Sequence, residues 1–166
     1  MIGDIDQLVL SCVLGVFRTM LNLDVVPFAP GTVNRALKDR EQQVAAAVGF
    51  SGAVTGVAYI YCSSSFAVQC SAVLLGSTIR DTSADEIVND MMGEIANMVV
   101  GKLKSGLCDR GLICVLGTPS VVRGTFSIES LSLSERRVMN FTCDGNSLTV
   151  EIMLKLTDSK LTAKNR

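Results

Sequence analysis

The spacing of apolar residues along the chain predicts helices and strands in a definite order. Apolar side chains recur every three or four positions over residues 4–21, which predicts a first helix. A loop with Pro27 and Pro30 should follow it. The stretches 42–50 and 53–62, joined at 50–52, have the composition of two strands. A second helix, capped by Ser64 or Ser65, should then run to about Gly76.

The second half of the chain predicts the longest helix and further strands. Ser83 followed by Glu86 has the spacing of a capping box, so a helix should occupy about 84–104. Strands are expected at 112–116, in the stretch 120–142 and at 147–157, with Asp144 and Gly145 forming the last turn. The order of these elements predicts an α+β fold with helices packed on a largely antiparallel sheet.

The length of 166 residues suits a single domain with a sizeable core. We expect residues 1–157 to form this domain and the polar residues 158–166 to be a frayed tail. A helix followed by strands occurs twice, which suggests an internal duplication of one helix–strand unit. The first helix has no Glu followed three residues later by Asn, so the two units should differ at any polar site.

Charge and hydropathy narrow the possible partners. The net charge of −1 provides no general attraction to nucleic acid. Residues 42–79 carry no charge, yet glycines and a serine cluster interrupt them, so we expect buried strands and a buried helix rather than a membrane span. The cysteine usage described in the next paragraph favours a cytoplasmic location. The hydrophobic fraction of 48% favours surface buried against a second subunit, and hence a homodimer.

The absence of histidine restricts the chemistry available to this chain. It removes the commonest general base and the commonest metal ligand. Six cysteines are present, but no pair has the C-x-x-C spacing of a zinc or redox site. We therefore expect reduced thiols packed as small apolar side chains, and no metal bound by this chain.

A polar stripe lies on the longest predicted helix. Asp90 and Glu94 are four residues apart and Asn97 is three further on, so the three side chains should share one face. Gly101 continues that stripe one turn later, and Pro119 follows after 21 residues beyond Asn97. The neighbouring apolar positions should face the core, namely Val88, Met91, Met92, Ile95, Met98 and Val99. An exposed acid–amide stripe can be no more than a solvated face unless a partner docks on it.

The segment Asp90-Met91-Met92-Gly93-Glu94-Ile95-Ala96-Asn97, with Pro119 downstream, resembles the signature of the CheC, CheX and FliY family of chemotaxis phosphatases. A single copy of the signature is most similar to CheX. The resemblance implies hydrolysis of the phospho-aspartate of a CheY-like response regulator. It implies that Asn97 orients the attacking water and that Glu94 anchors the active-site lysine of the regulator.

The resemblance assigns supporting roles to the other residues of the signature. Asp90 would position the helix or touch the partner, Gly101 would permit close approach, and Pro119 would end a strand beside the site. The Mg²⁺ needed for the reaction would be supplied by the phosphorylated regulator, so this chain needs no cofactor. The alternative is a catalytically silent adaptor of the same fold that binds a regulator or a flagellar component.

Overall fold

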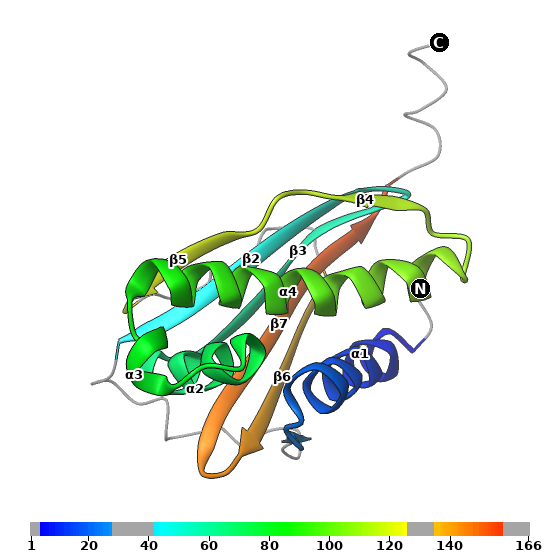
Figure 1. Cartoon of the computed structure of the whole chain (residues 1–166). Coiled ribbons are helices and arrows are strands. Elements are labelled where there is room, and N and C mark those ends of the chain that lie inside the picture. The colour runs from blue at the N-terminus through cyan, green and yellow to red at the C-terminus, as the bar shows by residue number, and fades with distance from the viewer. Residues whose placement is uncertain (1–3, 28–41, 126–134, 158–166) are drawn as a thin grey trace.

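The computed structural model describes residues 4–27, 42–125 and 135–157, which form one antiparallel sheet with helices against it (Figure 1). The helices of these residues are α1 Ile5–Leu21, α2 Ser64–Leu75, α3 Ile79–Thr82 and α4 Asp85–Cys108. The strands of the described chain are β1 Val26–Pro27, β2 Gln43–Gly52, β3 Val54–Ser63, β4 Cys114–Leu116, β5 Ser120–Gly124, β6 Glu135–Cys143 and β7 Asn146–Leu156.

The strand order reveals two similar halves. The β2–β3 hairpin and the β6–β7 hairpin meet in the middle of the sheet, where β3 pairs with β7. β1, which follows α1, pairs with β6 of the other half, and β4 and β5, which follow α4, pair with β2. Each half therefore supplies the edge of the other. The predicted α+β fold on an antiparallel sheet is confirmed, and its duplicated arrangement is visible in this order.

The core lies between the sheet and its helices. α4 runs across the sheet beside α1 and α2, all on the same face (Figure 1). Side chains from every layer are fully buried there, as expected for an apolar helix stripe on a sheet face. Examples are Phe17, Phe66, Ile95, Phe141 and Leu148. This packing makes α4 a fixed platform for whatever its outer face carries.

The opposite face of β7 also contains buried side chains, including a charged one. Glu151 is only 1% exposed, and its Oε1 lies 2.5 Å from Nε of Arg136 on the neighbouring strand. Tyr61 donates its hydroxyl to the other carboxylate oxygen. A buried carboxylate requires such partners because an unpaired charge in the interior is costly. Burial, together with the charge of Glu151, raises the pKa of Tyr61 to about 12.

The helix caps differ from the prediction. Ser63 caps α2 by accepting a hydrogen bond from the Phe66 amide, so the expected caps Ser64 and Ser65 were wrong. The predicted capping box at Ser83 is also absent, because the short helix α3 comes first. Ser83 ends α3 and its hydroxyl donates to the Arg80 carbonyl, which leaves Ala84 at the start of α4. Sequence spacing alone could not exclude this competing local bond.

The element boundaries also require corrections. α4 continues past the predicted end at residue 104, because Leu103 and Leu107 remain buried and Gly106 packs against Leu8 of α1. The stretch 120–142 contains two strands in different parts of the sheet, β5 and β6. Pro27 lies in the two-residue strand β1 rather than in a loop. Pro30 and the predicted tail 158–166 lie outside the described residues.

The cysteines and the uncharged segment behave as expected. All six cysteines are free, and five of them are buried. Burial raises the pKa of the thiols of Cys62 and Cys70, so both remain protonated at neutral pH. The uncharged segment forms β2, β3 and α2. None of the helices in the described ranges has the length and apolar character that crossing a membrane requires.

Candidate functional site

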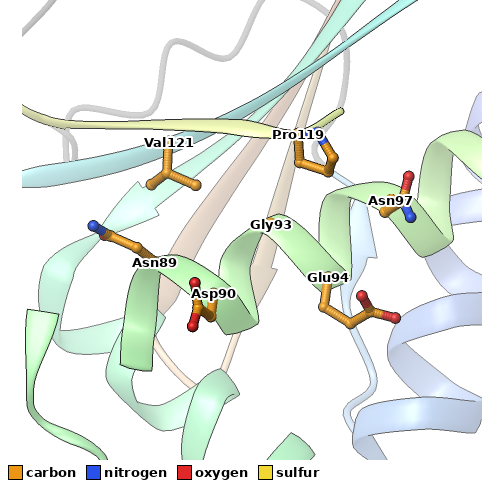
Figure 2. A pocket seen from close by; sticks show the side chains of 7 residues that line it. All are labelled: Asn89, Asp90, Gly93, Glu94, Asn97, Pro119 and Val121. Carbon is orange, nitrogen blue, oxygen red and sulfur yellow. The ribbon is translucent and has the colours of Figure 1, made fainter. Parts of the chain in front are cut away.

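An open groove lies between α4 and the segment that leads into β5. It has a volume of about 400 Å³. One wall is the outer surface of α4 and the other is the segment at Pro119 and Val121 (Figure 2). The groove is lined by Asn89, Asp90, Gly93, Glu94, Asn97, Pro119 and Val121. The structure thus brings together four of the five residues that the sequence singled out.

The inward face of α4 determines what its outward face presents. Val88, Met92, Ile95 and Val99 are buried against the core, whereas Met91 and Met98 are half-buried. The opposite face exposes Asp90, Glu94 and Asn97. Within the described chain, none of these three side chains forms a hydrogen bond or an ion pair. They are therefore free to contact another molecule.

The polar residues of α4 form two neighbouring rows. Asn89, Gly93 and Asn97 follow each other at four-residue spacing and lie on the side toward the strand (Figure 2). Asp90 and Glu94 point away from the strand, toward the outer rim of the groove. The two carboxylates make this rim negative, which favours a cationic group on a partner. Glu94 and Asn97 thus stand on adjacent sides of one opening.

A bulge in the edge of the sheet places Pro119 against the groove. Leu116 pairs with Phe50 of β2, and Ser120 pairs with Ala47, so the three residues 117–119 lie opposite only two residues of β2. An extra residue of this kind bends the strand and redirects its side chains. A residue in a bulge need not donate its amide to the ladder, so proline, which has no amide hydrogen, is tolerated there. The predicted break at Pro119 is therefore a bulge between β4 and β5.

Gly93 forms the floor of the groove, although the sequence analysis did not single it out. A Cβ atom at Gly93 would lie 3.5 Å from Cβ of Pro119 and 3.9 Å from Cγ2 of Val121. A side chain larger than alanine would fill the opening. The sequence held a usable signal, because Gly93 lies midway between Asn89 and Asn97 in the row facing the strand.

Gly101 lies farther along α4 and does not line the groove. A Cβ atom at this position would meet no atom within 4 Å. One turn beyond Asn97, the surface of α4 at Gly101 therefore carries no side chain and is not covered by other residues of the described chain. This is compatible with the close approach that was predicted for Gly101.

Arg123 joins the strand wall to the start of α4 and was also missed. Its Nε donates to Oδ1 of Asn89 at 2.6 Å, and its Nη2 donates to the main-chain oxygen of Asp85 at 3.2 Å. Its Nη1 lies 3.2 Å from a carboxylate oxygen of Asp85. Arg123 shares one strand face with Val121, two residues earlier, so alternation along the strand was the available signal.

The first helix carries no second copy of this site. Its buried positions follow the same spacing as those of α4, starting from Ile5 in one helix and Val88 in the other. In that alignment the positions of Asp90, Glu94 and Asn97 are occupied by Gln7, Ser11 and Leu14. The expected difference between the two units is therefore present in the structure. In the part of the chain described, no three His, Cys, Asp or Glu side chains gather to hold a metal ion.

Comparisons with known proteins identify the family and the fold of this chain. Residues 44–142 match the family model described as chemotaxis phosphatase CheX. The chemotaxis protein CheX from Vibrio vulnificus is 25% identical, with a TM-score of 0.75, over 92% of this chain and 97% of that one. A CheC-like superfamily protein from Shewanella sp. PV-4 is 27% identical, with a TM-score of 0.77, over 93% and 99%.

A third solved structure shares the fold. It is a chain of the CheX–CheY–BeF₃–Mg²⁺ complex from Borrelia burgdorferi, 23% identical with a TM-score of 0.71, over 92% of this chain and 98% of that one. No curated protein sequence matches this chain significantly. The family model spans more than half of the chain and includes all the residues that line the groove, from Asn89 to Val121. The protein therefore belongs to the CheX family of chemotaxis phosphatases.

Proposed function

We propose that this protein hydrolyses the phospho-aspartate of a CheY-like response regulator. The observation that carries the proposal is the groove itself. It is lined by Glu94 and Asn97, and neither side chain has a hydrogen-bond or ion-pair partner in the described chain. Family membership and the fold shared with the Borrelia complex support a response regulator as the partner. Such a partner would place the protein in the cytoplasm.

Glu94 and Asn97 have different roles because one side chain is charged and the other is neutral. Glu94 lies on the negative rim, so its carboxylate can pair with the lysine of the regulator and fix the docked orientation. Asn97 offers an amide donor and a carbonyl acceptor beside it, which suits a water molecule that must be held in line with phosphorus. Asp90 contributes to the same negative rim and supports docking.

The reaction needs no base from this chain. The water oxygen forms a bond to phosphorus while the bond between phosphorus and the aspartyl oxygen breaks. The aspartate leaves as a carboxylate, and the proton of the water passes to the phosphate product. The regulator would hold the Mg²⁺, which would supply positive charge to offset that of the phosphoryl group. Positioning and charge neutralisation are the main requirements of phosphoryl transfer, so an amide can serve without histidine.

A phosphate-release assay tests this proposal. CheY-like regulators from the same organism are phosphorylated with acetyl phosphate in the presence of Mg²⁺, and phosphate release is followed with and without this protein. Acceleration at substoichiometric protein supports a phosphatase. Stable binding to a BeF₃-activated regulator with an unchanged phosphate lifetime would contradict it and favour the adaptor.

We also propose that the protein is a homodimer. Ile113, Val115 and Val122, in or beside the edge strands β4 and β5, are 69%, 63% and 56% exposed. Exposed β-branched residues on an edge strand are suited to association with a second copy. Sedimentation velocity at micromolar concentration should give a dimer, and Val115→Lys should shift it toward monomer. A monomeric wild-type protein would contradict this proposal.

A further inference from the structure

Arg123 is the polar connection between the two walls of the groove. Three of its nitrogens contact the first two turns of α4, at Asn89 and Asp85. Its side chain is only 18% exposed, and its hydrogen bond to Asn89 is part-buried, whereas the side chain of Asp85 is 76% exposed. In the described ranges, every polar side-chain contact between α4 and β5 involves Arg123. Guanidinium groups suit this task because they bond several acceptors in a fixed plane.

The rest of β5 makes no polar side-chain contact with α4 in the described ranges. The strand pairs with β2 along one side. Toward α4 it meets Gly93, which has no side chain to fix the separation. The width of the groove is therefore fixed at one end by Arg123 and left open in the middle.

Arg123 can influence the site without touching it. Val121 and Arg123 project from the same face of β5, and Pro119 lies just before this strand. On the helix, Asn89 belongs to the row that leads through Gly93 to Asn97. A change in the distance between Arg123 and Asn89 would thus move the wall that faces Asn97. The catalytic side chains themselves remain on α4, which is held by the core.

We infer that Arg123 is a positioning residue that sets the width of the groove and so the docking of the response regulator. The inference rests on the proposed function. It assigns no contact with the regulator to Arg123. Loss of the guanidinium should weaken productive docking while the chemical step at Asn97 is largely retained. In kinetic terms, KM should rise and kcat should change little.

The test compares Arg123→Met with wild type in steady-state dephosphorylation of a regulator. Methionine keeps an unbranched apolar chain but removes the charge and all donors. We expect KM to rise roughly tenfold and kcat to stay within about twofold, since a charge-assisted contact set is lost at a distance from the chemistry. Arg123→Lys keeps the charge without the planar fork and should fall between the two.

A matched control separates positioning from stability. Arg136→Met removes a comparable arginine from the buried carboxylate of Glu151, far from the groove, and should lower the melting temperature. It should leave KM unchanged. Hydrogen exchange of residues 120–124 should be faster in Arg123→Met than in Arg136→Met.

The outcomes are distinguishable. If wild-type protein accelerates dephosphorylation and Arg123→Met shows the same KM as the Arg136→Met control, the positioning role is wrong and the phosphatase stands. A fall in kcat alone, with KM unchanged, would also overturn the inference. If wild-type protein is inactive on every regulator, the proposed function fails and the positioning role fails with it.

Discussion

Gly93 and Pro119 face each other across the groove, and a Cβ atom on Gly93 would lie 3.5 Å from the Cβ atom of Pro119. This separation is an ordinary van der Waals contact, so one methyl group fits but a longer side chain does not. The bulge at 117–119 brings Pro119 to this position. The opening beside Asn97 therefore depends on a missing side chain in one wall and an extra residue in the other.

This separation predicts that alanine at position 93 raises the stability of the protein, whereas leucine at the same position weakens binding of the regulator. Gly93→Ala should fold and gain up to about 1 kcal/mol in the free energy of unfolding, because alanine is the better helix former. Gly93→Leu should fill the groove and raise KM for the regulator by at least about tenfold. Chemical denaturation and steady-state kinetics measure the two effects. An unchanged KM in Gly93→Leu would show that the regulator does not enter the groove.

A second prediction concerns the charge of the rim. Glu94→Gln removes a carboxylate that is free to pair with a lysine of the partner, so KM should rise by about tenfold at low salt. The difference from wild type should shrink as ionic strength increases. Glu86→Gln is the matched control, since Glu86 is an exposed carboxylate on the first turn of the same helix, outside the groove. Equal effects of both substitutions would rule out a specific anchor at Glu94.

A third prediction compares two glycines on α4. A Cβ atom at Gly101 meets open space, so Gly101→Ala should stabilise the protein by up to about 1 kcal/mol. At Gly106 the same atom would overlap Leu8 of α1, so Gly106→Ala should give no gain or a loss. Urea unfolding of both variants provides the measurement. Similar stabilisation by both would contradict the close packing of α1 on α4. Gly101→Trp should also raise KM if the regulator covers this turn.

A fourth prediction follows from raised pKa values. Burial raises the pKa of the thiols of Cys62 and Cys70 above the ordinary value near 9, and that of Tyr61 to about 12. The unfolded chain loses these protons at lower pH than the folded chain. The free energy of unfolding therefore has its full value below pH 9 and decreases as pH rises above it. The decrease is about 1.4 kcal/mol per pH unit for each group that has lost its proton in the unfolded chain but keeps it in the folded chain.

Unfolding by urea under reducing conditions at pH 8, 9, 10 and 11 tests this dependence. Tyr61→Phe removes one of the groups and should flatten the curve above pH 10. A free energy of unfolding that stays constant from pH 8 to pH 11 would be inconsistent with buried, protonated side chains at these positions. Near neutral pH these groups stay protonated in both the folded and the unfolded chain, so their titration should not change the free energy of unfolding there.

Periodicity was enough to predict the platform of the site. Apolar spacing located α1 and α4 because each of these helices buries one clear face, and the same spacing placed Asp90, Glu94 and Asn97 on one exposed surface. The end of α4 was missed because its last turn is stabilised by α1, at the contact of Leu8 with Gly106. A contact between distant segments leaves no trace in the local pattern.

The second wall of the groove was harder to predict. A bulge depends on the register of β4 and β5 against β2, which only the assembled sheet determines. Arg123 appeared as a single charge in a strand, and its partners lie on a helix far away in the sequence. The roles of Glu94 and Asn97 come from resemblance to a family, and they remain predictions for this chain.

The most direct test of the account is the lifetime of the phospho-aspartate on a CheY-like regulator with an excess of this protein. Wild type should shorten it, and Asn97→Ala should reduce the acceleration by roughly 100-fold or more while changing the free energy of unfolding by about 0.5 kcal/mol or less. Gln69→Ala is the matched control, because Gln69 is an exposed carboxamide on α2, and it should behave as wild type. Full acceleration by Asn97→Ala would contradict the mechanism.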